Sequence, residues 1–115
     1  MTWAVNLASM VVPEIAPDEL APRLDDVMLI DVRQPEEYAA GHVRTAHLLP
    51  LQEVPDHVAE LPTDAEVVVM CRSGSRSAMA SEFLLEQGVR AVNLAGGILA
   101  WADAGHEVVT GDQPS

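Results

Sequence analysis

Short apolar runs alternate with amphipathic segments along most of this chain. Runs of branched apolar residues that are too short for helices indicate buried strands, whereas apolar residues spaced three or four apart indicate helices. On this basis we expect strands at 27–32, 46–51, 65–70 and 90–94. We expect helices at 17–24, 34–41, 54–62, 75–88 and 96–105. This alternation predicts an α/β fold, with a central parallel sheet of about five strands and helices on both faces.

Proline and glycine support several of these boundaries. Pro17, Pro35 and Pro55 stand where a helix begins, and a proline is tolerated at the first helical position because its missing N–H would have no partner there. Gly41 and Gly88 stand where a helix should end.

The same pattern predicts one domain. No repeat and no linker divides the 115 residues, a length that suits a single core. Residues 1–12 are apolar without periodicity, and we expect a loosely held arm there. We expect the domain to span 13–108 and residues 109–115 to form a flexible tail.

Charge narrows the range of partners. The chain has eighteen acidic residues and six basic ones, all arginines, which gives a formal net charge of −12. A surface this acidic repels nucleic acid and anionic membranes, so we expect neither as a partner. No apolar run is long enough to span a membrane. No basic residue precedes Arg23, so the N-terminus lacks the charged start of a secretory signal. The one cysteine cannot form an intrachain disulfide, so nothing indicates an oxidising compartment. We therefore expect a cytoplasmic protein.

The one cysteine, Cys71, directly follows the most apolar of the predicted strands. Active sites of parallel sheets form at the carboxyl ends of the strands. Gly74 permits a tight turn in which backbone N–H groups point inward, and the next helix begins there with its positive dipole end. If Arg72 and Arg76 also point inward, each of these features lowers the thiol pKa from its usual value of about 8.5. Residues 71–76 therefore predict a nucleophilic cysteine in an anion-binding loop. The alternative for Cys71 is an inert buried cysteine, and the alternative for Arg72 and Arg76 is a pair of solvated surface charges.

Two chemistries use such a loop: phosphate-ester cleavage by cysteine, and sulfur transfer through a cysteine persulfide. Cysteine phosphatases have five residues between the cysteine and the arginine, whereas here there are four between Cys71 and Arg76. A tighter ring of N–H donors suits a smaller electrophile than a tetrahedral phosphate, which favours sulfur transfer.

Three segments then resemble the rhodanese family of sulfurtransferases, and the resemblance covers residues 13–106. The segments are LIDVRQPEEYAAGHV (29–43), VVVMCRSGSRS (67–77) and VNLAGGILAW (92–101). The resemblance implies a single rhodanese-like domain in which Cys71 carries the persulfide. It implies that the donor is bound by the loop residues Arg72, Ser73, Gly74, Ser75, Arg76 and Ser77. Two departures from the family pattern leave this loop unchanged: Thr45-Ala46, where the family often has glycine followed by alanine, and GHEV (105–108), where the family often has G-x-P.

Other polar residues are assigned supporting roles. We expect Asp31 and Arg33 to form an ion pair that braces the loop after their strand, in preference to contacting substrate. The spacing of the four histidines matches no metal site. The resemblance to the family, whose first segment includes the Gly41-His42 pair, implies that His42 makes a structural hydrogen bond. The glutamates of the predicted helices are interpreted as solvated, namely Glu36, Glu37, Glu82 and Glu86.

The sequence thus predicts a thiosulfate sulfurtransferase without a metal or an organic cofactor. Its partners would be a small anionic sulfur donor and a nucleophilic acceptor, which is cyanide in vitro and a thiol or protein thiol in the cell. Two alternatives remain: a non-catalytic rhodanese module that binds or regulates a partner, and an arsenate reductase or phosphatase on the same fold.

Overall fold

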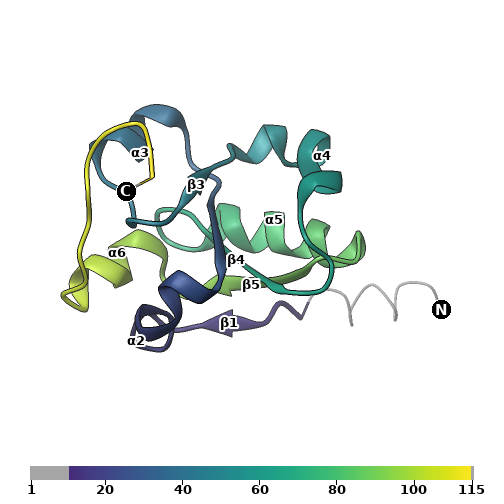
Figure 1. Cartoon of the computed structure of the whole chain (residues 1–115), viewed down its shortest axis with the longest axis horizontal. Coiled ribbons are helices and arrows are strands. Elements are labelled where there is room, and N and C mark those ends of the chain that lie inside the picture. The colour runs from purple at the N-terminus through teal and green to yellow at the C-terminus, as the bar shows by residue number, and fades with distance from the viewer. Residues whose placement is uncertain (1–10, 115) are drawn as a thin grey trace.

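The computed structural model describes residues 11–114, which form a parallel five-stranded sheet between two layers of helices (Figure 1). The strand order is β1-β5-β4-β2-β3, and every pairing is parallel. The strands are β1 (Glu14–Ile15), β2 (Met28–Asp31), β3 (His47–Leu48), β4 (Glu66–Met70) and β5 (Arg90–Leu94). The predicted α/β fold with about five parallel strands is confirmed.

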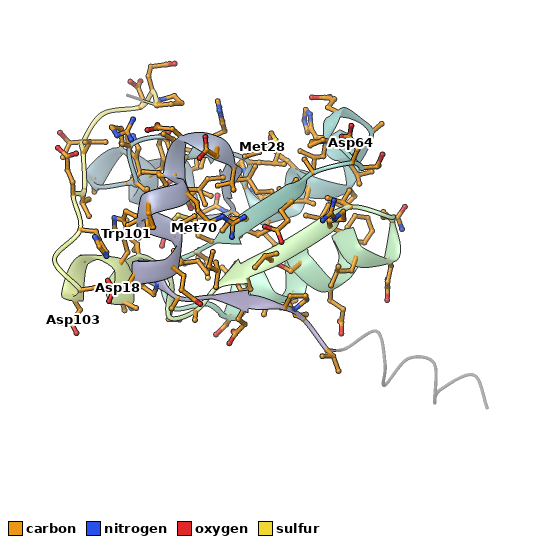
Figure 2. All side chains as sticks on the ribbon, turned by 60° about the horizontal axis from the view of Figure 1, so that its bottom comes forward. Asp18, Met28, Asp64, Met70, Trp101 and Asp103 are labelled. Atoms are coloured by element: carbon orange, nitrogen blue, oxygen red, sulfur yellow. The ribbon has the colours of Figure 1, made fainter. Side chains whose placement is uncertain are left out.

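Helices cover both faces of this sheet, as predicted. They are α2 (Pro17–Leu20), α3 (Pro35–Ala40), α4 (Val54–His57), α5 (Ser75–Glu86) and α6 (Gly97–Asp103), with 3₁₀ helices η1 (Ala21–Asp26), η2 (Leu51–Glu53) and η3 (Val58–Glu60). Successive side chains of a strand point to opposite faces. Val68 and Met70 of β4 therefore join a core layer that includes Trp101 of α6 (Figure 2), while Val67 and Val69 join the layer under α5.

Several predicted elements are shorter than expected. The helix expected at 17–24 leaves α-geometry after Leu20, because Pro22 has no N–H to donate to residue 18. The strand expected at 46–51 is only the two residues of β3, ahead of Pro50. The helix expected at 54–62 is divided into α4 and η3.

One strand was missed. The two residues of β1 pair with β5 in the register Glu14↔Asn93 and Ile15↔Leu94. The N–H groups of Asn93 and Ala95 extend this pairing, since they donate to the carbonyls of Pro13 and Ile15 at 2.8 and 2.9 Å. A strand of two residues is too short to show an alternating pattern.

The C-terminal segment is described up to residue 114, whereas most of the predicted N-terminal arm is not described. Ten residues of the predicted arm, 1–10, lie outside the described residues. At the other end, Val109 and His42 exchange two backbone hydrogen bonds of 2.8 Å, and the N–H of Gly111 donates to the carbonyl of Ala39 at 3.0 Å. The described part of the predicted tail thus contacts α3 and the residues after it, while the flexibility of 109–115 stays a prediction. Within residues 11–114, no helix is both long and apolar enough to cross a membrane.

Candidate active site

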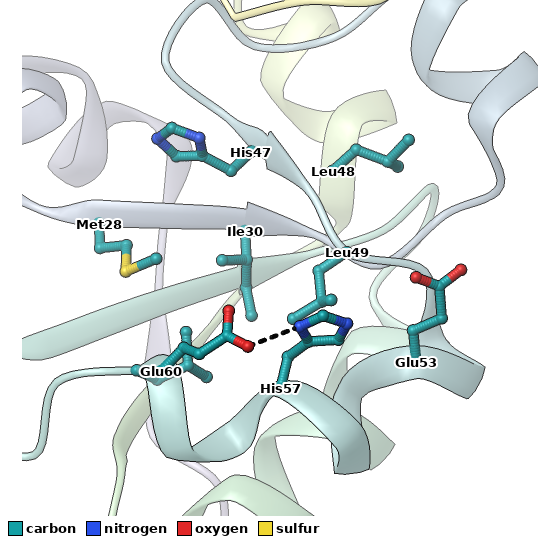
Figure 3. Close-up of a pocket in the computed structure, with 9 residues that line it drawn as sticks. Met28, Ile30, His47, Leu48, Leu49, Glu53, His57 and Glu60 are labelled. Carbon is teal, nitrogen blue, oxygen red and sulfur yellow. Dashed lines mark hydrogen bonds and ion pairs between the residues drawn. The ribbon is translucent and has the colours of Figure 1, made fainter.

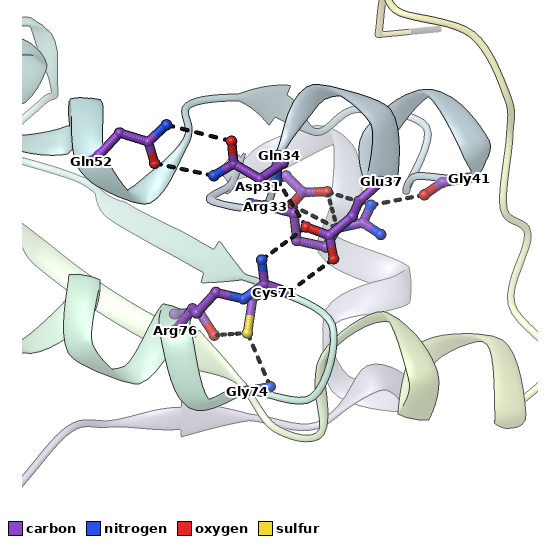
Figure 4. A network of polar contacts seen from close by, with 10 residues as sticks. Asp31, Arg33, Gln34, Glu37, Gly41, Gln52, Cys71, Gly74 and Arg76 are labelled. Carbon is purple, nitrogen blue, oxygen red and sulfur yellow. Dashed lines mark hydrogen bonds and ion pairs between the residues drawn. The ribbon is translucent and has the colours of Figure 1, made fainter.

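Cys71 lies at the carboxyl end of β4, in the loop that leads into α5 (Figure 4). It is buried, with 1% of its surface exposed. Gly74 caps α5 with φ of +107°, in the left-handed region that favours glycine. The loop therefore turns back on itself, and the first N–H groups of α5 lack partners inside the helix.

The outer side of the loop is held by β5 and α6. The N–H groups of Ile98 and Leu99 donate to the carbonyls of Cys71 and Arg72, at 2.9 and 3.1 Å. The Nδ2 of Asn93 donates to the carbonyl of Gly74 at 3.2 Å. With three loop carbonyls bonded on this outer side, N–H groups of the loop can face the thiol, and those of Ser73, Gly74 and Ser77 do so.

Gly97 makes this packing possible. A Cβ at residue 97 would lie 2.5 Å from the carbonyl oxygens of both Cys71 and Arg72, and φ there is +61°. Backbone atoms cannot move aside as a flexible side chain can, so any other residue would displace the loop from α6.

The Cys71 sulfur accepts hydrogen bonds from inside this loop. The N–H of Gly74 lies 3.1 Å from Sγ, and the hydroxyl of Ser77, itself fully buried, lies 3.3 Å from it. Burial alone would raise the pKa of the Cys71 thiol, but the Ser77 hydroxyl and the N–H groups of Ser77, Gly74 and Ser73 outweigh burial and lower the pKa below its ordinary value. This direction is the one predicted from the sequence, although the Ser77 hydroxyl was not foreseen as a donor.

Arg76 forms an ion pair that the sequence analysis did not foresee. Its two terminal nitrogens donate to Glu37 Oε1 and Oε2 of α3, at 2.8 and 2.9 Å (Figure 4). The interpretation of Glu37 as a solvated helix residue is therefore wrong, because its side chain faces the loop. The hydrogen bond from Arg76 is the main reason that the pKa of Glu37 is lowered to about 2. In the same pair, the hydrogen bond to Glu37 raises the pKa of Arg76.

Arg72 has a different environment. Its side chain is exposed, and within residues 11–114 it forms neither a hydrogen bond nor an ion pair with another side chain. Ser73 and Ser75 are exposed beside it, so the outer surface of the loop is polar and open to solvent.

The predicted ion pair between Asp31 and Arg33 is present and buried. Arg33 Nε and Nη2 donate to Asp31 Oδ1 and Oδ2 at 2.9 and 2.7 Å, and Nη2 also donates to the carbonyl of Gly41 at 2.7 Å. The pair thus ties the end of β2 to the end of α3, the helix that carries Glu37 (Figure 4).

His42 follows α3, and in the described structure none of its hydrogen bonds reaches residues 71–77. Its Nδ1 and Nε2 lie 2.8 and 3.0 Å from the carbonyl oxygens of Tyr38 and Gln113. Its ring stacks on Tyr38 with centroids 3.8 Å apart. These contacts join α3 to the C-terminal segment.

A separate hollow of about 310 Å³ opens between β3 and α4, and none of its lining residues belongs to the Cys71 loop (Figure 3). Its base is apolar, and at its rim His57 Nδ1 lies 3.0 Å from Glu60 Oε2. Within the described part of the chain, no three histidine, cysteine or acidic side chains are grouped as a metal site requires.

Comparisons with known proteins agree with this geometry. The model of the rhodanese-like domain matches residues 16–104. A sulfurtransferase of Allochromatium vinosum is 44% identical over 103 residues, covering 86% of this chain and 96% of its own. The thiosulfate sulfurtransferase GlpE of Pseudomonas entomophila is 35% identical, covering 76% of this chain and 82% of its own. The crystal structure of a rhodanese-related protein from Thermoplasma volcanium superposes with a TM-score of 0.80 at 32% identity, covering 84% of this chain and 97% of that one. The chain belongs to the rhodanese family of sulfurtransferases.

Proposed function

We propose that this protein takes sulfane sulfur from thiosulfate and passes it to a thiol, through a persulfide on Cys71. The observation that carries the proposal is the position of Cys71 Sγ, which accepts hydrogen bonds from Gly74 N–H and the Ser77 hydroxyl inside the loop. Those donors favour the thiolate, which is the nucleophilic form of cysteine. The name of the GlpE relative, a thiosulfate sulfurtransferase, supports the choice of donor.

The first step is an attack on the outer sulfur of thiosulfate. The Cys71 thiolate supplies the electron pair for a new S–S bond, the S–S bond of thiosulfate breaks, and sulfite leaves with the bonding pair. The product is a persulfide anion on Cys71. The N–H groups from Arg72 to Ser77 would hold this charge, and those of Ser73, Gly74 and Ser77 already bond to the sulfur.

The second step returns the cysteine. An acceptor thiolate attacks the outer sulfur of the persulfide, and the Cys71 thiolate leaves with the electrons of the broken bond. No net oxidation occurs over the cycle, so neither step requires an electron carrier. Asp31 and Arg33 would support the site by fixing α3, and His42 by joining α3 to the C-terminal segment.

Intact-mass measurement tests the proposal. Protein incubated with thiosulfate should gain the mass of one sulfur atom, and cyanide should remove it with release of thiocyanate. The Cys71→Ser variant is the control. A wild-type protein that gains no sulfur, or a Cys71→Ser variant that gains as much, would falsify the assignment.

The same preparation tests the phosphatase alternative. Four residues separate Cys71 from Arg76, and the tighter ring crowds the three equatorial oxygens of a transferring phosphate. We therefore expect negligible hydrolysis of an aryl phosphate. Cys71-dependent hydrolysis at a rate comparable to thiosulfate turnover would mean that loop length does not select the reaction.

A further inference from the structure

One of the two arginines of the loop, Arg76, is paired with a carboxylate from outside the loop. Arg76 is the arginine that ends the loop sequence, yet both of its terminal nitrogens already donate to one carboxylate, that of Glu37. A two-point pair of this kind fixes the guanidinium plane as well as its position. An incoming anion must therefore share Arg76 with a carboxylate that is already bound to it.

Glu37 is itself held in place. Its Oε1 accepts the N–H of Gln34 at 3.0 Å, and the Gln34 side chain is hydrogen-bonded to that of Gln52 (Figure 4). Its side chain is 28% exposed, against 35% for Arg76, so the pair is partly shielded from water. The carboxylate cannot swing away to release Arg76 without losing contacts on two sides.

In the described structure, neither Arg33 nor Arg72 compensates for this pairing. Arg33 is already paired with the carboxylate of Asp31. Of the two arginines in residues 71–77, Arg72 is the one that has no carboxylate partner in the described structure. Arg72 is exposed to solvent, where water and salt screen its attraction. The thiolate of Cys71 is one more negative charge, in a chain whose formal net charge is −12.

We infer that Glu37 is a positioning residue that sets donor specificity: by holding Arg76 it lowers the affinity of the site for dianions relative to monoanions. The inference rests on the proposed function, and it adds the charge class of the preferred donor. Thiosulfate would bind, but a donor that presents the same sulfur with one charge fewer would bind with less electrostatic cost. The methanethiosulfonate anion, in which a methyl group replaces one oxygen of thiosulfate, is such a donor. Its transfer step balances in the same way, because Cys71 takes the outer sulfur and methanesulfinate leaves with the bonding pair.

The first test compares the two donors in Glu37→Gln and in Glu36→Gln. The glutamine at 37 keeps an oxygen for the N–H of Gln34 but removes the charge that competes for Arg76. We expect the KM for thiosulfate to fall about tenfold, as a charged hydrogen bond becomes available, and kcat to change much less. The KM for methanethiosulfonate should change no more than about threefold, because a monoanion gains less from the freed charge. Glu36 is the matched control: it is the neighbouring, exposed acid of α3, and its change to glutamine removes the same net charge without freeing Arg76.

A second measurement does not depend on turnover. Alkylation of Cys71 by iodoacetamide is followed in the presence of sulfate, a dianion, or methanesulfonate, a monoanion. Sulfate should protect Glu37→Gln at about one tenth of the concentration that protects the wild type, while protection by methanesulfonate shifts less. If wild type forms no persulfide from either donor, the proposed function fails, and the role of Glu37 is still decided by this protection.

A double-mutant cycle completes the test. In an Arg76→Gln background, Glu37→Gln should leave the ratio of sulfate to methanesulfonate protection unchanged. The inference is overturned if Glu37→Gln alters that ratio no more than Glu36→Gln does, or if it weakens protection by sulfate. The second result would show that Glu37 orients Arg76 for anion binding and does not restrain it. Thermal unfolding of each variant identifies a change that comes from lost structure.

Discussion

The hydroxyl of Ser77 offers the sharpest test of how this loop activates Cys71. It is fully buried and lies 3.3 Å from Sγ, so Ser77→Ala removes one donor to the thiolate while the N–H groups of the loop remain. A hydrogen bond to a charged acceptor contributes about 1.5–3 kcal/mol, and at this length we expect the lower end. Since about 1.4 kcal/mol corresponds to a factor of ten, the thiolate fraction at a pH below the thiol pKa should fall about tenfold.

The rate of Cys71 alkylation by iodoacetamide, measured from pH 4 to pH 10, reports that fraction directly. In Ser77→Ala the midpoint should move to higher pH, and the plateau at high pH should rise by no more than about threefold, because the nucleophilicity of a thiolate increases with its pKa with a Brønsted slope of about 0.4–0.5. Ser81→Ala is the matched control: Ser81 lies one turn further along α5, is equally buried, and its hydroxyl has no partner in the described structure. Ser81→Ala should leave the alkylation profile unchanged and should stabilise the fold by up to about 1 kcal/mol. The reasoning is refuted if Ser77→Ala alkylates with the wild-type profile, or if both variants shift alike.

Two further predictions concern stability. Gly97→Ala should abolish sulfur transfer and lower the free energy of unfolding well beyond the effect of Gly88→Ala, as measured by urea unfolding. Both glycines have positive φ, but only a Cβ at 97 meets backbone oxygens, and one at 88 meets nothing within 4 Å; equal losses in the two variants would exclude the clash as the cause. Glu37→Gln should be less stable than wild type at pH 7 by about 1 kcal/mol, a value reduced for solvent screening of a partly exposed pair. Because the pKa of Glu37 is depressed from 4.5 to about 2 by folding, this advantage is complete above about pH 5 and is lost as pH falls towards 2. A stability difference that stays constant from pH 7 to pH 2.5 would contradict it.

The sequence predicted best those elements that carry their own local signals. The strands at 65–70 and 90–94 and the helix at 75–88 agree with β4, β5 and α5 to within two residues, because apolar runs and flanking glycines mark them. Elements that depend on a distant partner were less predictable. The two residues of β1 are a strand only because β5 accepts them at the sheet edge.

The candidate site divides in the same way. Cys71 and its loop could be located from the strand, the glycine and the helix start that surround them. The partner of Glu37 could not be predicted, because Arg76 is 39 residues away in the sequence and a helical pattern does not indicate which distant residue a side chain contacts. A signal was nonetheless present: Glu37 and Arg76 belong to the segments 29–43 and 67–77, both of which resemble the rhodanese family.

We expect the reactivity of Cys71 and the affinity for the donor to depend on different parts of this site. The groups that lower the pKa of Cys71 are a hydroxyl and backbone N–H groups, which carry no net charge and lie inside a buried loop. The groups that would attract an anion from solution are arginine side chains, which are charged. Four of the six arginines are already paired with carboxylates in the described structure. Salt screens exposed charges much more than buried dipoles. Alkylation of Cys71 by neutral iodoacetamide should therefore depend little on ionic strength, whereas the KM for thiosulfate should depend on it strongly. In a chain of this net charge, we expect a thiolate stabilised by the backbone to keep its reactivity as salt is added, and we expect the pairing of Arg76 with Glu37 to influence which anions bind beside it.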